Sequence, residues 1–295
     1  MPTSSPAHSP NHAMRVLHTR EEMGAARADL RDVGLVPTMG FLHDGHLSLV
    51  ARARAERASV VATIFVNPTQ FGPGEDLARY PRNLERDLAL LDAAGVDIVF
   101  VPDAAEIYPS GFNTRVEVLG VTDVLEGAIR PGHFSGVATV VTKLFNIIRP
   151  NCAYFGQKDA QQSIVIRKLV ADLDLPIEVI IAPTVREPDG LALSSRNSYL
   201  TPAQRKVAPI IFQALSKAKA LFDAGETDAE VLRRAERTVL EAEPDIKIDY
   251  ISIASAQTLR ELMIAEPGAL ASMAVRLGST RLIDNLLLGE ACTPA

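Results

Sequence analysis

Short apolar runs alternate with amphipathic stretches along the first two thirds of the chain. Apolar, largely β-branched runs at 14–17, 33–36, 59–66, 96–101, 153–155 and 177–181 predict buried strands. Helical spacing between these runs predicts helices over 19–30, from His46 onward, over 81–93 and 136–149, and up to about 171. Because strands and helices alternate, the pattern predicts a parallel α/β sheet with right-handed crossovers.

The pattern changes after Pro188-Asp189-Gly190. Two long helices are predicted at 201–222 and 227–242, followed by strands at 247–253 and 271–277 and a last apolar stretch at 281–288. We therefore expect an α/β domain over residues 14–185 and a smaller α+β domain over residues 186–295, with a hinge near 183–190.

Composition limits the class of protein. The chain has 295 residues, is 47% hydrophobic and carries a net charge of −6 without a basic run, which argues against a nucleic-acid partner. No apolar run reaches membrane-spanning length. The two cysteines lie far apart, as expected in a reducing compartment. Residues 1–13 are rich in Ser, Pro and His and predict a disordered tail.

Polar clusters follow four of the predicted strands, at 37–46, 67–72, 156–162 and 183–197. In parallel sheets, ligands bind beyond the carboxyl ends of the strands. Although these clusters are far apart in sequence, we expect them to meet at one edge of the sheet.

The first cluster contains a strand, a turn with two glycines, and a helix start. Free N–H groups and the positive end of the helix dipole suit a phosphate there, and His43 and His46 would lie on one face beside it. A loop with two solvated histidines is the ordinary alternative. A catalytic zinc would need a third ligand, and none follows nearby.

The other clusters offer phosphate-binding and amide groups. Lys158 could hold a phosphate as a point charge, Ser194, Ser195 and Arg196 form a second set of donors, and Gln70 and Gln162 offer amides to a polar substrate. Taken singly, these groups are more typical of a surface Lys–Asp ion pair, a turn and buried structural amides than of a binding site. Arg130 and His133 lie in what could be a plain turn.

Together these groups suit a nucleoside triphosphate. The sequence contains no Gly-x-x-x-x-Gly-Lys-Ser/Thr loop, no Ser-centred nucleophile elbow and no Gly-x-Gly-x-x-Gly. We therefore favour nucleotidyl transfer, in which a carboxylate displaces diphosphate from the α-phosphorus and the protein supplies alignment and positive charge.

Five motifs, in order, resemble those of the pantothenate synthetase (pantoate–β-alanine ligase) family. They are Pro37-Thr38-Met39-Gly40 with His43-Asp44-Gly45-His46; Phe65-Val66-Asn67-Pro68-Thr69-Gln70-Phe71; Arg130-Pro131-Gly132-His133-Phe134; Phe155-Gly156-Gln157-Lys158-Asp159-Ala160-Gln161-Gln162; and Leu193-Ser194-Ser195-Arg196-Asn197. The resemblance runs from about residue 33 to 205 and continues more loosely beyond. His-x-x-His alone would indicate only the wider nucleotidyltransferase superfamily.

The resemblance implies a Rossmann-like N-terminal domain with a smaller C-terminal lid, in a cytoplasmic homodimer. It implies that ATP and pantoate form pantoyl adenylate and diphosphate, and that β-alanine then gives pantothenate and AMP, with Mg²⁺ accompanying the ATP. The ligands that the resemblance implies are small molecules, and it implies neither a nucleic-acid partner nor a membrane partner.

The resemblance also assigns roles by motif position. His46 would be the proton donor towards the phosphates, and Gln70, Gln162 and Asn67 would hold pantoate, Gln70 also holding β-alanine. The residues expected at ATP are Met39, Gly40, Phe41, Leu42, His43, Asp44, Gly45, His46, Gly156, Gln157, Lys158, Asp159, Val185, Leu193, Ser194, Ser195 and Arg196. The resemblance assigns no magnesium ligands.

Three positions depart from the family pattern, and two other functions compete. Position 157 is Gln where many members carry Glu, position 160 is Ala where an aromatic is common, and Thr69 varies. None of these removes a group that the chemistry needs. The alternatives are a nucleotidyltransferase that stops at a nucleotide-linked product and a nucleotide-binding regulatory module without catalysis.

Overall fold

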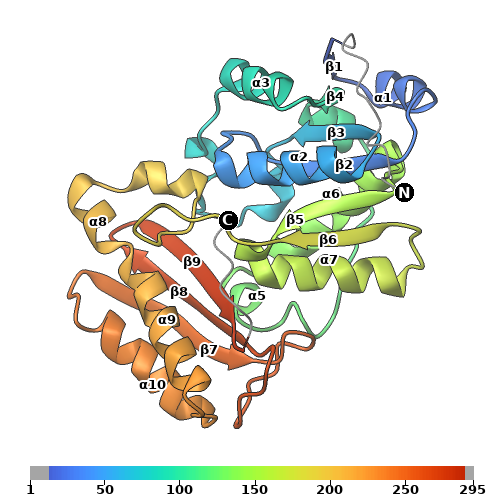
Figure 1. Ribbon diagram of the computed structural model, residues 1–295. Helices are drawn as coiled ribbons and strands as arrows, with labels where there is room; N and C mark the ends of the chain where they lie inside the picture. The colour runs from blue at the N-terminus through green and yellow to red at the C-terminus, as the bar shows by residue number, and fades with distance from the viewer. Residues whose placement is uncertain (1–12, 290–295) are drawn as a thin grey trace, which may run out of the picture.

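The computed structural model describes residues 13–289 and contains two sheets (Figure 1). The predicted tail, residues 1–13, lies outside the described residues except for Ala13. No helix within the described range has both the length and the apolar character needed to cross a bilayer.

The larger sheet has six strands in the order β1-β4-β3-β2-β5-β6, all paired in parallel. Its strands are β1 (Arg15–Leu17), β2 (Val33–Thr38), β3 (Ser59–Ile64), β4 (Ile98–Phe100), β5 (Cys152–Gly156) and β6 (Glu178–Ala182). The α/β class predicted from the alternating pattern is confirmed.

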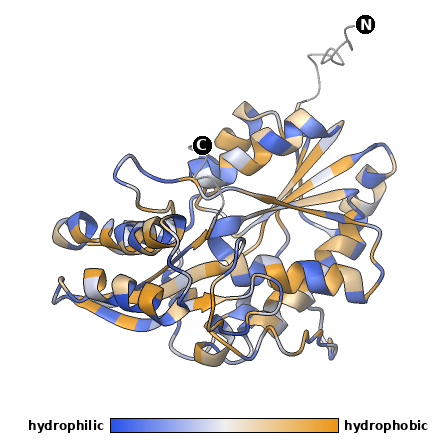
Figure 2. Cartoon of the chain, turned by 60° about the horizontal axis from the view of Figure 1, so that its bottom comes forward, coloured by the Kyte–Doolittle hydropathy of each residue, from blue (hydrophilic) through white to orange (hydrophobic). Residues whose placement is uncertain are grey.

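Helices cover both faces of this sheet. One face packs against α1 (Arg20–Arg27), α6 (His133–Ile148) and α7 (Ala160–Asp172), and the other packs against α2 (Asp44–Glu56) and α3 (Leu84–Ala93). Successive residues of the central strands alternate between the two cores, as Leu35 and Val36 do. The strands are therefore mainly apolar on both faces, and they are largely orange in Figure 2. Short helices α4 (Ala104–Ile107) and α5 (Glu126–Ile129) lie in the connection between β4 and α6.

The smaller sheet is antiparallel, in the order β7-β8-β9, and forms the predicted α+β part. Its strands are β7 (Ile246–Ala254), β8 (Leu270–Leu277) and β9 (Thr280–Leu287). Helices α9 (Ile210–Asp223) and α10 (Ala229–Leu240) pack on it in a separate core. The predicted fold class is confirmed, and the division into domains near residue 185 stays a prediction.

Several predicted boundaries are wrong for identifiable reasons. β2 does not end at Pro37 but continues to Thr38, since only β3 pairs with it there and the missing N–H of Pro37 is tolerated. The predicted helix at 201–222 is interrupted before Pro209, giving α8 (Pro202–Val207) and α9.

Three predicted helix starts are also displaced. α2 begins at Asp44 rather than His46, with His43 as its N-cap residue. α3 begins at Leu84 rather than Pro81, because the Asn83 side chain accepts a hydrogen bond from the Arg86 N–H and caps it. α6 begins three residues earlier than expected, at His133.

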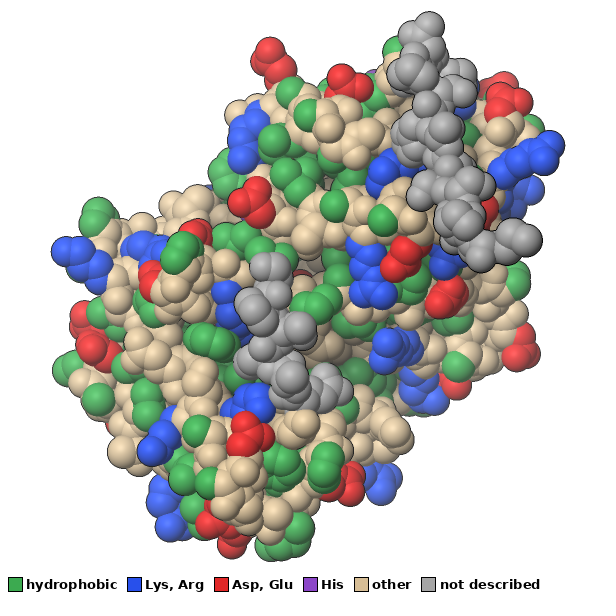
Figure 3. Space-filling view, in the orientation of Figure 1, with side chains coloured by type: hydrophobic (Ala, Val, Ile, Leu, Met, Phe, Trp, Pro, Cys, Tyr) green, Lys and Arg blue, Asp and Glu red, His purple; other side chains and the backbone are tan. Residues whose placement is uncertain are grey.

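The visible surface carries no single-sign charge field. In Figure 3, acidic and basic side chains are interspersed over both parts of the molecule. This distribution agrees with the absence of a basic run in the sequence.

Candidate active site

A cavity of about 230 Å³ lies at the carboxyl ends of β2, β3, β5 and β6. Segments from all four predicted polar clusters line it, so the expected convergence is found. The predicted site residues that line it are Met39, His43, Gly45, His46, Asn67, Gln70, Gly156, Lys158, Asp159, Gln162, Val185, Leu193, Ser194, Ser195 and Arg196.

Five predicted ATP residues do not line this cavity. They are Gly40, Phe41, Leu42, Asp44 and Gln157. The first three form the turn that leads into α2, and Asp44 is an exposed residue in its first turn. The Gln157 amide instead donates to Asn285 Oδ1 at 3.0 Å, away from the cavity.

The turn between β2 and α2 depends on a buried carboxylate that the sequence analysis missed. Asp87, on α3, is 1% exposed and accepts hydrogen bonds from the N–H groups of Phe41 (2.6 Å) and Leu42 (2.8 Å). Gly40 has φ +81°, and a Cβ there would lie 3.1 Å from Asp87 Oδ2. Asp87 and the buried Leu91 are four residues apart and therefore lie on the same face of α3. A carboxylate on the apolar face of a predicted helix was thus the sequence feature that could have indicated this role.

His43 and His46 stack at the start of α2, with ring centroids 4.0 Å apart. The main-chain N–H of His43 donates a hydrogen bond to His46 Nδ1 at 3.4 Å. Because Nδ1 accepts this bond, the proton of a neutral His46 ring is on Nε2. Burial, followed by the neighbouring His43, lowers the pKa of His46 to about 3. Burial, followed by the Lys158 ammonium, lowers the pKa of His43 to about 4. Both rings are therefore neutral near pH 7 in this state.

Two cationic side chains, Lys158 and Arg196, line the cavity. Lys158 lies in the turn after β5, with its Nζ 3.5 Å from Asp159 Oδ1. Arg196 donates from Nε and Nη2 to the two carboxylate oxygens of Asp76, each at 2.9 Å. Ser195 Oγ donates to the Phe41 carbonyl at 3.3 Å and ties this loop to the β2–α2 turn. Asp76 has no sequence signature, because only the fold brings it to Arg196.

Amide side chains also line the cavity. Asn67 Nδ2 donates to Gln70 Oε1 at 3.0 Å and to the Gly136 carbonyl at 3.2 Å. Its Oδ1 accepts from the Thr69 N–H and hydroxyl and from the Tyr108 hydroxyl. Asn67 is 1% exposed, so its side chain is used within the protein to orient Gln70. Gln70 Nε2 contacts Met39 Sδ at 3.2 Å, and Gln162 also lines the cavity.

This arrangement brings cationic, imidazole and amide groups into one cavity. Lys158 and Arg196 can neutralise phosphate charge, and neutral His43 and His46 can donate hydrogen bonds to phosphate oxygens. Gln70 and Gln162 can bind an uncharged polar group, while Phe65, Val137 and Val141 form an apolar wall. The cavity is therefore suited to bind a phosphorylated ligand together with a small polar molecule.

Comparisons with known proteins agree with this chemistry. The family model "Pantoate-beta-alanine ligase" matches residues 13–287. A pantothenate synthetase of Chloroflexus aggregans is 61% identical over 276 residues, covering 93% of this chain and all of the relative. The crystal structure of pantothenate synthetase from Thermus thermophilus is 52% identical, with a TM-score of 0.90 over 93% of this chain and 99% of that one.

A third relative was solved with ligands. The pantoate–β-alanine ligase of Francisella tularensis, complexed with "Beta-gamma ATP" and β-alanine, is 36% identical. Its TM-score is 0.78, over 95% of this chain and 100% of that one.

Proposed function

Because the chain belongs to the pantoate–β-alanine ligase family, we propose that it condenses (R)-pantoate with β-alanine, using ATP and giving pantothenate, AMP and diphosphate. The observation that carries the proposal is the single cavity in which His43, His46, Lys158 and Arg196 meet Gln70 and Gln162.

The proposed first step forms pantoyl adenylate. Gln70 and Gln162 hold pantoate, and its carboxylate oxygen forms a bond to the α-phosphorus as the bond to the leaving diphosphate breaks. Lys158 and Arg196 neutralise the growing negative charge, while His46 Nε2–H donates a hydrogen bond to a phosphate oxygen. A neutral His46 is a hydrogen-bond donor rather than an acid, and the negative charge of a bound triphosphate would raise its pKa.

The proposed second step needs no second cavity. The β-alanine amine attacks the acyl carbon of the adenylate, and AMP departs with the bridging oxygen. The relative solved with a nucleotide and β-alanine supports binding of both molecules within one such fold.

Magnesium belongs to the proposal as a companion of ATP. Within residues 13–289, no group of three or more His, Cys, Asp or Glu side chains could hold a metal ion. Mg²⁺ commonly binds through substrate phosphates and one or two carboxylates, and Asp159 is the one carboxylate of the described residues that lines this cavity. Asp159 would hold the ion, which supplies charge neutralisation to the phosphates.

A cytoplasmic homodimer completes the proposal. The buried thiol of Cys152 suits a reducing compartment. Closure of the smaller part over the triphosphate, with a hinge near 183–190, is likewise proposed.

Diphosphate release tests the proposal against its two alternatives. We expect release that depends on pantoate, with AMP and pantothenate appearing when β-alanine is added. A nucleotide-linked product that β-alanine does not consume would favour a nucleotidyltransferase, and ATP binding without any release would favour a regulatory module.

A substitution at Gln70 tests whether this side chain binds pantoate. Gln70→Ala should raise the KM for pantoate about tenfold, the cost of one buried hydrogen bond, and change the KM for ATP much less. Gln213→Ala, an exposed glutamine of α9, is the control. The reverse pattern would remove Gln70 from the pantoate pocket.

A further inference from the structure

We propose that Arg130 and His133 are positioning residues that hold the main chain of Gln70, so that the Gln70 amide faces the carboxylic-acid substrate. The inference rests on the proposed function. It concerns the Arg130-Pro131-Gly132-His133-Phe134 motif, to which neither the sequence nor the proposed reaction gives a role.

The hydrogen bonds between Arg130, His133 and Gln70 form a relay with a single direction. His133 Nδ1 lies 2.8 Å from the Gln70 carbonyl oxygen, and Arg130 Nη1 lies 3.1 Å from His133 Nε2. Because a guanidinium can only donate, Nε2 must accept, and the proton must be on Nδ1, where it is donated to Gln70. Burial, followed by the Arg130 guanidinium, lowers the pKa of His133 to about 4, so the ring keeps this neutral form near pH 7.

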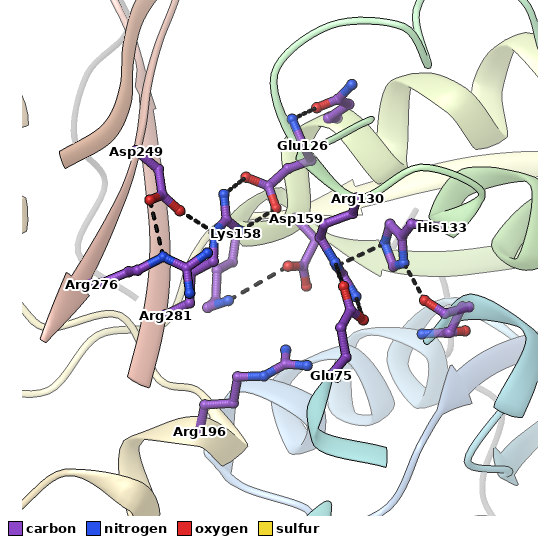
Figure 4. A network of polar contacts seen from close by, with 12 residues as sticks. Glu75, Glu126, Arg130, His133, Lys158, Asp159, Arg196, Asp249, Arg276 and Arg281 are labelled. Atoms are coloured by element: carbon purple, nitrogen blue, oxygen red, sulfur yellow. Dashed lines mark hydrogen bonds and ion pairs between the residues drawn. The ribbon is translucent and has the colours of Figure 1, made fainter. Parts of the chain in front are cut away.

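The far end of the relay is anchored by a carboxylate. Arg130 donates from Nε and Nη2 to the two oxygens of Glu75, each at 2.8 Å. Figure 4 shows Arg130 between Glu75 and His133, with its guanidinium directed at both. Glu75 fixes two nitrogens of the guanidinium, which leaves Nη1 aimed at the imidazole.

The Gln70 carbonyl needs this partner. Gln70 is the last residue of a 3₁₀ turn, Pro68–Gln70, whose terminal carbonyls have no partner within the turn. The first turn of α6 packs directly on it, since a Cβ on Gly136 would lie 2.4 Å from the Thr69 carbonyl oxygen. His133, 8% exposed, thus reaches the carbonyl from a close and rigid neighbour. A carbonyl freed by loss of His133 would shift and misdirect the Gln70 side chain.

Two conservative substitutions separate positioning from general stability. His133→Asn places an amide donor where Nδ1 was and loses the contact with Arg130. His133→Gln places an amide where Nε2 was, so it keeps the contact with Arg130 but donates no hydrogen bond to the Gln70 carbonyl.

We expect His133→Gln to raise the KM for pantoate about tenfold, which corresponds to the loss of one hydrogen bond with a buried partner. We expect His133→Asn to raise it no more than about threefold. The KM for ATP should change less than about threefold in both variants.

The measurement is pantoate-dependent diphosphate release, with the thermal unfolding midpoint of each variant recorded. Equal effects of the two variants, or equal changes in the pantoate and ATP constants, would overturn the relay. An inactive wild-type chain would instead overturn the proposed function.

A second pair of variants applies if His133→Gln does not fold. Glu75→Gln should raise the KM for pantoate severalfold. The control Glu106→Gln removes a partly exposed carboxylate paired with Arg20 and should leave that constant unchanged. Identical results for Glu75→Gln and Glu106→Gln would overturn the relay as well.

Discussion

At the scale of single residues, the protonation of His46 decides what it can do. Its Nδ1 accepts a hydrogen bond from the main-chain N–H of His43, and its pKa of about 3 keeps the ring neutral near pH 7. The ring therefore presents an N–H to the cavity without carrying a charge. A bond to an oxygen whose charge grows as diphosphate departs is stronger in the transition state than in bound ATP.

Replacing His46 by Ala and by Gln tests this role. His46→Ala should lower kcat by about 10²- to 10³-fold, as loss of a transition-state hydrogen-bond donor does, while the Kd for ATP changes far less. His46→Gln should retain more activity, since its amide can donate from the position of Nε2. Steady-state rates and ATP titration calorimetry supply the two quantities, with exposed His18→Ala as the control. Equal losses in kcat and in ATP affinity would contradict the role.

Residues with a chemical signature could be found from sequence, and their supporting partners could not. His43, His46, Lys158 and Arg196 follow predicted strands and belong to recognisable motifs. Asp76 contacts Arg196 from 120 positions away, and although His133 lies in a motif, its contact with Gln70 spans 63 positions. No spacing rule links residues so far apart, because the fold alone determines which side chains meet.

At the scale of elements, the β2–α2 turn is held from outside by α3. Asp87 satisfies two N–H groups that neither the strand nor the helix can use. The positive φ of Gly40 and of Phe41 (+50°) makes the turn depend on that support.

Asp87→Ala should therefore destabilise the protein by about 2 to 4 kcal/mol, the cost of leaving two partly buried N–H groups without partners. Urea unfolding measures the change. Asp92→Ala, an exposed carboxylate on the same helix, should lower the free energy of unfolding by less than about 0.5 kcal/mol. A similar small effect for both variants would show that the turn does not need Asp87.

Element types could be predicted from sequence better than element boundaries. Hydrophobic periodicity indicates which face of an element is buried, so the sequence predicts the parallel strands and the amphipathic helices correctly. Helix starts depend on single capping residues such as Asn83, and the extent of β2 depends on which neighbour pairs at Pro37. Tertiary contacts, rather than the local sequence pattern, therefore determine where these elements begin and end.

At the scale of the whole molecule, β9 connects the smaller sheet to the turn that carries Lys158. Asn285 Nδ2 donates to the carbonyls of Gln157 (3.0 Å) and Lys158 (2.9 Å). Arg281 donates from Nη2 to Glu126 Oε1 at 2.7 Å, across the two parts. Movement of the smaller part would therefore displace the turn that carries Lys158.

The stability of the smaller part should depend on pH through Glu236. This residue of α10 is fully buried, neither carboxyl oxygen has a hydrogen-bond partner within residues 13–289, and burial raises its pKa well above the usual value. The folded state thus holds the proton more tightly than the unfolded state. Its stabilising contribution is present below the unfolded pKa of about 4.5 and is lost as pH rises through the folded pKa.

Glu236→Gln removes this titration. Relative to wild type, the variant should be more stable by about 1 to 3 kcal/mol at pH 8, and the difference should shrink towards pH 4. Urea unfolding across that range gives the difference, with exposed Glu266→Gln as the control. A difference that does not change with pH would show that Glu236 does not titrate on unfolding.

The central claim is that the loops at the sheet edge align the carboxylate of an acid with the α-phosphorus of ATP. Pantoate labelled with ¹⁸O in its carboxylate tests this most directly, by mass spectrometry of the products formed with β-alanine. The claim predicts one ¹⁸O atom in each AMP and the other in the amide carbonyl of pantothenate. Unlabelled AMP, or label in orthophosphate or diphosphate, would contradict attack at the α-phosphorus.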